Sequence, residues 1–340
     1  ANFDGDLSID TTGYDPRGAA VTNTLPNGVA SGDVTQDSVV LWTRSTALGD
    51  LTFEYSTDAG EASIAGTVTA AVTDGDVPVK VDVDGLEAGT EYFFRVTDAA
   101  GNSEEGRFLT AAEQGTYNGL TFGISGDWQQ APPYPILNSA ANRNLDVFVK
   151  LGDTIYADLE TPALPGVTQA RTLSDFRTKH SEVLSPRFGL SATADLQATT
   201  SIIATIDDHE LVDNFAGGAA PGESPDAPDI GSSPDPLFTD DVEFVNDTQA
   251  YEDALQAYQE YQPIRDKFYG ETGDDRTAGE RQLYRAQAFG SDASIFVTDS
   301  RSFRDAQLEP ANIADPTAFL VQAFDPSRTL LGRAQLDLLK

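Results

Sequence analysis

The chain has 340 residues and carries 55 acidic against 21 basic side chains, a formal net charge of −34 at pH 7. Nucleic-acid binders gain affinity by neutralising phosphates with Lys and Arg, so this charge excludes a polyanionic nucleic-acid partner and argues against anionic membrane surfaces. The absence of Cys excludes disulfides and zinc–thiolate sites. Length and a hydrophobic fraction of 39% suit a globular protein of about two domains.

Composition also bears on where the protein works. The chain begins with Ala1, contains no Met, and has no apolar run approaching ~18 residues. We therefore expect a processed protein without a transmembrane segment that is secreted, periplasmic or at the cell surface. The acidic excess is mostly Asp and Lys is scarce, which suits salty media, because the Debye length falls to ~3 Å at 1 M salt. A calcium-rich extracellular surface is the alternative explanation.

The first third of the chain has the pattern of an antiparallel β-sandwich. A polar lead over residues 1–20 comes first. Short alternating runs then recur between Gly- and Asp-rich turns, at 39–42, 51–55, 79–83, 92–96 and 106–109. This spacing of short strands predicts a sandwich domain over residues 21–112.

From residue 118 onward the apolar runs become continuous and alternate with helical stretches. The runs lie at 120–124, 147–151, 202–206 and 295–297, and the predicted helices at 134–142, 172–182 and 248–265. Continuous runs indicate strands buried on both faces, so we expect an α/β layered domain over residues 118–340. Within it, the Pro- and Gly-rich segment 216–236 predicts a long surface loop or lid.

Each continuous run ends at carboxylates. They are Asp127, Asp153, the Asp-Asp-His-Glu sequence at 207–210, and Asp299. Ligands of open α/β sheets bind beyond the carboxyl ends of the strands, so we expect these acids to converge on one crevice. A single such Asp could be a helix N-cap, but acids at four strand ends in succession favour a shared ligand-binding site. Clustered carboxylates repel one another and either take up protons or hold a cation, and this many favour a cation.

The donors available favour a hard cation. Besides carboxylates, the sequence offers the phenol of Tyr156, three residues after Asp153, and the imidazole of His209. This oxygen-rich set suits calcium, magnesium, manganese or ferric iron better than zinc. Two metals bridged by Asp153 would bind and polarise a phosphoryl group. Bound cations would also reverse the local field, so that an acidic protein can accept a phosphate ester.

A series of motifs runs through most of the chain in a fixed order. They are Gly-Val-Ala-Ser-Gly-Asp at 28–33, Val-Val-Leu-Trp-Thr-Arg at 39–44, Asp-Gly-Leu at 84–86, Glu-Tyr-Phe-Phe-Arg at 91–95, Leu-Gly-Asp-Thr-Ile-Tyr at 151–156, Thr-Leu-Ser-Asp-Phe-Arg at 172–177, Asp-Asp-His-Glu at 207–210, Tyr-Gln-Pro-Ile-Arg at 261–265, Asp-Ser-Arg-Ser-Phe-Arg at 299–304 and Leu-Gly-Arg-Ala-Gln at 331–335. Together they resemble the PhoD-like alkaline phosphatases and phosphodiesterases of the calcineurin-like metallophosphoesterase superfamily. The resemblance implies an all-β fibronectin-like sandwich followed by an α/β four-layer metallophosphoesterase domain, with a centre of Fe³⁺ and Ca²⁺.

The resemblance also implies roles for single residues. Asp153 matches the metal-bridging acid, Tyr156 the iron-binding phenolate, and Asp208 a ligand of the second metal. His209 matches a histidine that handles the phosphate or the leaving group, and Arg177 matches a phosphate contact. The alternatives are ordinary packing for Tyr156, a structural role for His209, and a helix-surface ion pair for Arg177.

Two departures from the family pattern stand out. Asp127 occupies the position where PhoD-like proteins usually carry a cysteine ligand, which hardens the site and favours Ca²⁺, Mn²⁺ or Mg²⁺ at both positions. The family's further metal ligands come from a Gly-Asp-x-His-type motif beyond the segment matching 331–340, and this sequence has no such motif. We therefore expect a C-terminally incomplete catalytic domain, or a site that is completed in another way.

The expected function is that of a secreted, metal-dependent phosphoesterase, an alkaline phosphatase and/or phosphodiesterase. It would release phosphate from small organic esters by metal-activated attack. The alternative is a catalytically silent surface or assembly protein that retains the fold. A third hypothesis is a calcium-binding module without catalysis. The absence of an Asp-x-Asp-x-Asp-Gly loop argues against it. The sequence predicts no oligomeric state.

Overall fold

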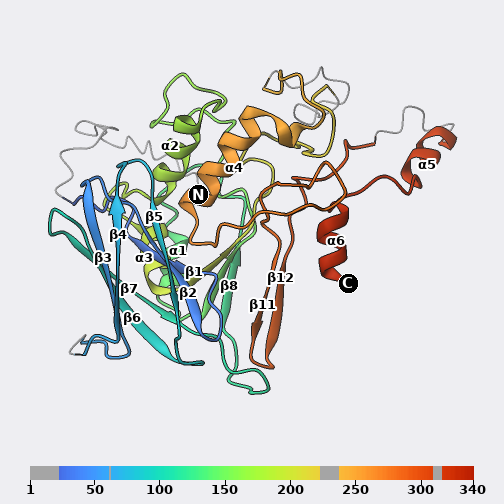
Figure 1. Cartoon of the computed structure of the whole chain (residues 1–340). Helices are drawn as coiled ribbons and strands as arrows, with labels where there is room; N and C mark the ends of the chain where they lie inside the picture. The colour runs from blue at the N-terminus through green and yellow to red at the C-terminus, as the bar shows by residue number, and fades with distance from the viewer. Residues whose placement is uncertain (1–22, 61–62, 223–236, 309–315) are drawn as a thin grey trace, which may run out of the picture.

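The computed structural model describes residues 23–60, 63–222, 237–308 and 316–340. The expected polar lead at 1–20 lies outside the described residues, and so does most of the predicted loop at 216–236. Figure 1 shows a strand-rich first part followed by a region of mixed strands and helices. The fold class predicted from the sequence, an all-β region followed by an α/β region, is confirmed. Within the described ranges, no helix is both long and apolar enough to span a bilayer.

The first strands form two sheets around a common apolar core. One is antiparallel, with the order β4 (Gly66–Val72), β3 (Gly49–Ser56), β6 (Glu91–Thr97) and β7 (Ser103–Leu109). The other contains β1 (Val29–Gly32), β2 (Ser38–Thr43) and β5 (Val79–Asp84). Buried residues of both sheets, such as Leu41 and Phe94, share one core. The alternating pattern predicted five of these strands and missed β1 and β4.

The second of these sheets continues into the α/β region. Its six strands have the order β5-β2-β1-β10-β9-β8, where β8 is Phe122–Ser125, β9 is Val147–Lys150 and β10 is Ser201–Ala204. The junction is the parallel pairing of Gly32 with Ile202. A Cβ atom on Gly32 would lie 2.3 Å from the carbonyl oxygen of Pro263 and 2.7 Å from that of Ile202. Glycine is therefore required where the two regions of the chain join.

The shared sheet separates two apolar cores. Residues along β9 and β10 alternate between them: Val147 and Ile203 pack toward the first strands, whereas Phe148 and Ile202 face the second core. Four helices contribute to that second core, namely α1 (Ile136–Ala141), α2 (Leu173–Leu184), α3 (Ala192–Thr199) and α4 (Gln249–Tyr261). The predicted burial of β9 and β10 on both faces is confirmed.

Local chemistry explains the helix boundaries. Thr172 caps α2 by accepting a hydrogen bond from the Asp175 N–H, and the Asp175 carboxylate accepts from the Thr172 N–H in return. The predicted helix 248–265 is wrong at its end, since α4 stops at Tyr261. Pro263 lacks an N–H, and its ring disfavours helical geometry in the preceding residue, so the helix cannot continue.

Two strand predictions need correction. The run 120–124 was expected to be buried on both faces, but β8 is the edge strand, and Phe122 and Ile124 are 54% and 56% exposed. The run 295–297 was expected in the same layered sheet. It lies in β12 (Ala293–Val297), which pairs antiparallel with β11 (Arg285–Phe289) in a separate hairpin. A short apolar run does not by itself reveal its strand neighbours.

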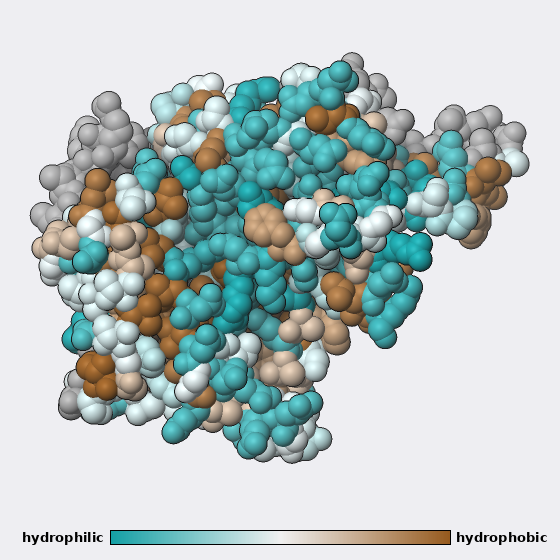
Figure 2. All heavy atoms as spheres, in the orientation of Figure 1, coloured by the Kyte–Doolittle hydropathy of each residue, from teal (hydrophilic) through white to brown (hydrophobic). Residues whose placement is uncertain are grey.

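The remaining described elements are short. They are the 3-10 turn η1 (Val245–Asp247) and the helices α5 (Thr317–Ala323) and α6 (Arg333–Leu339). Figure 2 shows a face that is mostly hydrophilic, with apolar side chains gathered over the first strands and over α5. The residues Val321 and Phe324, in α5 and at its end, are 70% and 80% exposed.

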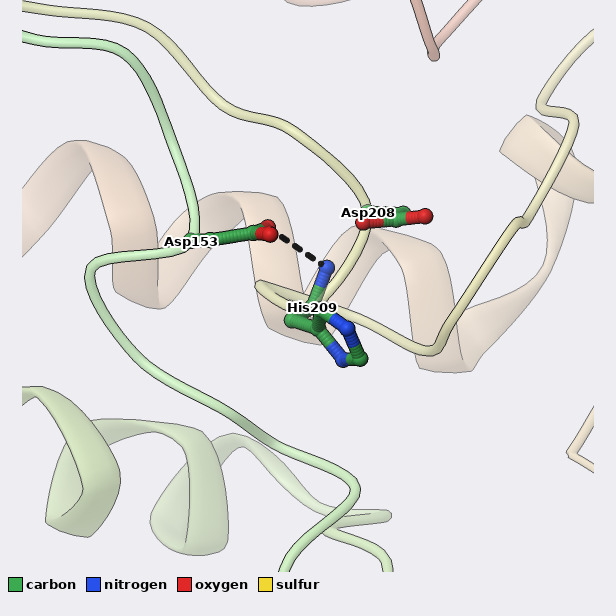
Figure 3. A group of neighbouring side chains, drawn as sticks. All are labelled: Asp153, Asp208 and His209. Atoms are coloured by element: carbon green, nitrogen blue, oxygen red, sulfur yellow. Dashed lines mark hydrogen bonds between the residues drawn. The ribbon is translucent and has the colours of Figure 1, made fainter. Parts of the chain in front are cut away.

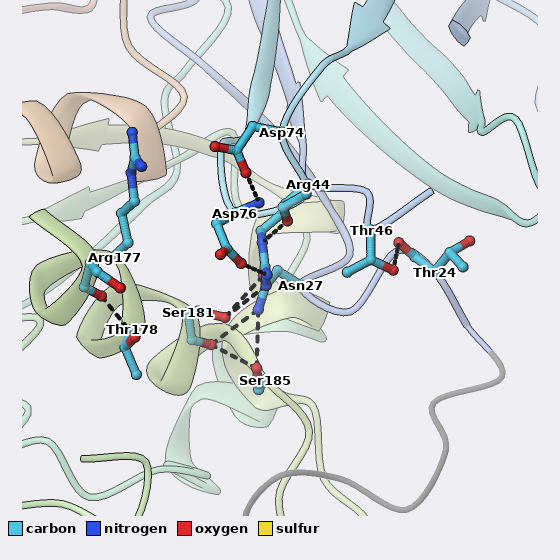
Figure 4. Close-up of polar contacts among 12 residues, drawn as sticks. Thr24, Asn27, Arg44, Thr46, Asp74, Asp76, Arg177, Thr178, Ser181 and Ser185 are labelled. Atoms are coloured by element: carbon cyan, nitrogen blue, oxygen red, sulfur yellow. Dashed lines mark hydrogen bonds and ion pairs between the residues drawn. The ribbon is translucent and has the colours of Figure 1, made fainter. Parts of the chain in front are cut away.

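A polar network fixes α2 to the first strands (Figure 4). The guanidinium of Arg44 donates to Asn27 at 3.1 Å and to Ser181 at 3.0 Å, and pairs with Asp76 at 2.8 Å. The Asn27 amide donates in turn to the Ser181 carbonyl at 3.0 Å and to the Ser185 hydroxyl at 3.1 Å. Because each hydrogen-bonding group satisfies another, a largely buried arginine is accommodated at this contact.

The last residue of β9 is a buried lysine. The ammonium of Lys150 donates to the side-chain oxygens of Gln197 and Gln262, the latter at 3.1 Å, and lies 5.7 Å from the centre of the Trp128 ring. Burial lowers the pKa of Lys150 from 10.5 to about 7, against the opposing influence of the Glu210 charge.

Substitution of Gly32 tests the junction of the shared sheet. Gly32→Ala places a methyl group against two backbone carbonyls and should lower the free energy of unfolding by about 1–3 kcal/mol. Urea unfolding measures the loss. Gly75→Ala is the control, because its nearest neighbour would be an ordinary 3.4 Å away, and it should change stability by less than about 0.5 kcal/mol. Equal stability of the two variants would contradict the tight junction.

Lys150 should leave a signature in the pH dependence of stability. Between pH 7 and 10.5 the unfolded chain holds a proton on Lys150 that the folded protein has lost, so the free energy of unfolding should rise with pH across this window. Lys150→Met should remove that component of the slope. Urea unfolding at a series of pH values measures it, with the exposed Lys267→Met as control. A Lys150→Met slope equal to that of the wild type would refute the lowered pKa.

Candidate metal centre

The site begins with three neighbouring parallel strands. β8, β9 and β10 pair in register, with Ser125 opposite Lys150 and Lys150 opposite Ala204. Their carboxyl ends therefore lie at one edge of the sheet, and the loops that follow them run side by side. Asp127 follows β8, Asp153 follows β9, and the acids at 207–208 follow β10.

The loops after β9 and β10 are in direct backbone contact. Gly152 has φ +100°, and a Cβ atom there would lie 2.2 Å from the Asp207 nitrogen. A side chain at this position would separate the loops, so glycine is needed for the close approach. The contact places the carboxylate of Asp153 beside the residues that follow β10.

Three of the predicted site residues come together. Ligand atoms of Asp153, Asp208 and His209 all lie within 4.8 Å of one another (Figure 3). The two carboxylates are buried, with 5% and 4% of the residues exposed, and His209 is partly buried. The backbone N–H of His209 also donates to Asp153 Oδ1 at 3.2 Å, which couples the two loops.

The electrostatics of this cluster fit a cation. Burial raises the pKa of Asp153 to about 8, with further contributions from the charges of Glu210 and Asp208. The raised pKa reflects the unfavourable proximity of these buried carboxylates, which a bound cation would relieve. The two carboxylates supply the oxygen donors that a hard cation prefers, and His209 lies beside them.

A carboxylate that the sequence analysis did not single out holds His209. Asp158 Oδ2 lies 2.7 Å from His209 Nδ1 and also accepts the Asp213 N–H at 3.1 Å. Burial alone would lower the pKa of His209, but the hydrogen bond and charge of Asp158, with Asp153, raise it to about 9. The only signal in the sequence was an acid two residues after Tyr156.

Tyr156 and Asp127 border the cluster. The Tyr156 ring stacks on the His209 ring, with centroids 4.0 Å apart and planes inclined by 22°. Burial raises the pKa of the Tyr156 phenol, and the charges of Asp153 and Asp127 raise it further. Asp127 is exposed at the end of β8 and has a left-handed φ of 53°. Tyr156 therefore contacts the cluster, whereas the Asp127 carboxylate is not among the ligand atoms that converge there. The roles of both residues as metal ligands stay predictions.

The other predicted residues lie elsewhere. Arg177, on α2, donates two hydrogen bonds of 2.7 Å to Glu260 on α4, and Figure 4 shows its side chain extending away from the Ser181 network. Its proposed phosphate contact stays a prediction.

Asp299 was expected to converge with the other strand-end acids, and it does not. It follows an antiparallel hairpin, is fully buried, and accepts hydrogen bonds from the N–H groups of Arg301 and Ser302.

Arg301 brings a positive charge to the cluster. Its guanidinium pairs with Asp207 at 2.5 Å and with Asp208 at 3.1 Å. Sequence reasoning missed this contact, because Arg301 follows β12 and lies 93 residues after Asp208 in the chain. The arginine partly offsets the repulsion among the acids without contacting Asp153 in the described structure.

Comparisons with known proteins identify the family. The model of "PhoD-like phosphatase" matches residues 122–340, and the model of "PhoD-like phosphatase, N-terminal domain" matches residues 13–112. "Alkaline phosphatase D" of Bacillus subtilis (strain 168) is 29% identical over 363 residues, which cover 97% of this chain and 56% of that protein. The solved "Structure of PhoD" matches with a TM-score of 0.73 and 25% identity, over 95% of this chain and 60% of that one. The chain thus spans little more than half of these relatives, and it belongs to the PhoD-like phosphatase family.

Proposed function

We propose that this chain carries the metal-binding centre of a phosphoesterase that acts on small phosphate esters. The observation that carries the proposal is the convergence of Asp153, Asp208 and His209 beyond the parallel strand ends, in a chain of the PhoD-like family. A relative bears the name "Alkaline phosphatase D", which supports phosphate-ester hydrolysis as the reaction class. Alkaline phosphatase and phosphodiesterase activity are both compatible with this centre.

The acidic residues would hold the cations. Asp153 and Asp208 are the central ligands, with Tyr156 and Asp127 as the adjacent donors. Oxygen donors favour Ca²⁺ with Fe³⁺, as the family resemblance implies, or Mn²⁺ or Mg²⁺ in their place. Such cations supply Lewis-acid polarisation of a phosphoryl oxygen and lower the pKa of water. Their charge also offsets the repulsion between a phosphate ester and a chain with a net charge of −34.

His209 would handle a proton in the reaction. Asp158 fixes the orientation of the ring through Nδ1, and Tyr156 restricts it from one face. In the metal-free protein, Asp158 and Asp153 raise the pKa of this imidazole, which would suit it to donate a proton to a leaving oxygen. Asp158 thus acts through His209 as an orienting group.

Export and adaptation to salt stay predictions from the composition. The excess of Asp over basic residues is the basis for adaptation to salt. A phosphoesterase outside the cytoplasm would release phosphate from organic esters in its surroundings.

Hydrolysis assays test the proposed function directly. The protein should hydrolyse 4-nitrophenyl phosphate or its bis ester, and chelation with EDTA should abolish turnover until metal is restored. Asp153→Asn should lower kcat/KM by at least about 100-fold, since even outer-shell partners of metal sites cost 10–100-fold. Asp84→Asn, an exposed acid at the end of β5, is the control and should retain the wild-type rate. Turnover that survives both chelation and Asp153→Asn would contradict a metal-dependent mechanism.

The two histidines allow a direct measurement of the Asp158 contact. In the chelated protein, NMR titration should show His209 with a pKa of about 9, and His180, which is fully buried, with its pKa lowered to about 3. Asp158→Asn removes the charge and should move the His209 titration to lower pH. Asp213→Asn should move it less, because that carboxylate lies 3.8 Å from Nε2. A His209 titration unchanged by Asp158→Asn would exclude the proposed orienting role.

A further inference from the structure

A fully buried carboxylate lies directly behind the metal cluster. Glu210 is 1% exposed and follows His209 in the chain. Its Oε2 accepts the N–H groups of Asp153 and Asp207, both at 3.0 Å, and its Oε1 accepts the Thr154 N–H at 3.0 Å. The Thr154 hydroxyl also donates to Oε1, at 3.3 Å. One side chain thus binds the backbone of two loops that are more than 50 residues apart in sequence.

These bonds act where the backbone is strained. Asp153 has φ 52°, in the left-handed region that non-glycine residues rarely adopt. Such a conformation persists only when the surroundings hold it, at a cost of about 1–3 kcal/mol. Glu210 accepts the N–H of Asp153 and the N–H of Thr154, the next residue along the chain. It therefore helps to hold the peptide that aims the Asp153 carboxylate into the cluster.

The same carboxylate determines the spacing of the ligands. Asp207, which precedes Asp208, is tied to the same Oε2 atom as Asp153. The His209 N–H donates back to the Asp153 carboxylate, so the two loops are joined by hydrogen bonds in both directions. Loss of Glu210 would allow the loops that carry Asp153 and Asp208 to separate, because its carboxylate binds the backbone of both.

We propose that Glu210 is a positioning residue for the metal centre, which holds the Asp153 and Asp208 loops at the spacing required for cation binding. The proposal rests on the proposed function, because it assumes that the cluster binds a cation. A group that orients metal ligands through the backbone typically affects metal affinity by about 10–100-fold. A group that only stabilises the fold would change stability and leave the affinity of the folded protein unchanged.

Glutamine at position 210 separates these roles. It keeps the size of the side chain but offers one acceptor oxygen, so its NH₂ group must face at least one of the backbone N–H donors. The matched control is Asp98→Asn. Asp98 is also buried, at 5% exposure, and accepts the N–H groups of Ala100 and Asn102 at 2.9 and 3.0 Å, but it lies among the first strands. Both variants should lower the urea midpoint, since each loses a buried acceptor.

The measured quantity is the affinity of the whole chain for Mn²⁺. Electron paramagnetic resonance of the free ion monitors the binding. The temperature is one at which circular dichroism shows every variant to be folded. We expect Glu210→Gln to raise the Kd for Mn²⁺ by about 10–100-fold and Asp98→Asn to leave it within about twofold. Equal affinity of Glu210→Gln and the wild type would overturn the positioning role, and so would an equal loss in both variants. Absence of Mn²⁺ binding by the wild type would instead overturn the metal centre itself, and the positioning role with it.

Discussion

The candidate site depends on the parallel pairing of β8, β9 and β10. Because these strands run in the same direction and in register, their carboxyl ends meet at one edge, and each continues into an acid-bearing loop. Gly152 lets two of those loops touch, which an L-residue with a side chain would prevent. The same sheet extends through β1 to the first strands, so the scaffold of the site includes residues from both predicted domains.

Two kinds of interaction stabilise the carboxylates in and around the cluster: hydrogen bonds from backbone N–H groups and ion pairs with an arginine. Glu210 and Asp153 accept backbone N–H groups, which stabilise a buried carboxylate without a cation. Arg301 pairs with Asp207 and Asp208. Burial and the charges of Glu210 and Asp208 nevertheless keep the pKa of Asp153 raised. The convergence of buried carboxylates distinguishes this cluster, as a candidate cation site, from the many exposed acids of the surface.

Sequence patterns predicted the parts of the structure that are local. Alternation identified β3 and β6, continuous apolar character identified β9 and β10, and the strand-end rule predicted that Asp153 and Asp208 would meet. The pattern was weaker where an element is short or lies at an edge. β8 was identified as a strand, but its edge position and exposed Phe122 depend on which neighbours the sheet has, and periodicity does not encode them.

The sequence by itself determined the family, the acidic character and the order of the chemical groups, because these are carried by residue types and by motifs along the chain. Only the tertiary structure decided which of the strand-end acids meet and which further groups contact them. Asp299 and Asp153 both follow apolar runs, yet one is held beside a hairpin and the other in the cluster. Asp158 and Glu210 gained their roles from contacts with His209 and with two loop backbones. Such contacts follow from the three-dimensional path of the loops, which spacing along a single sequence does not specify.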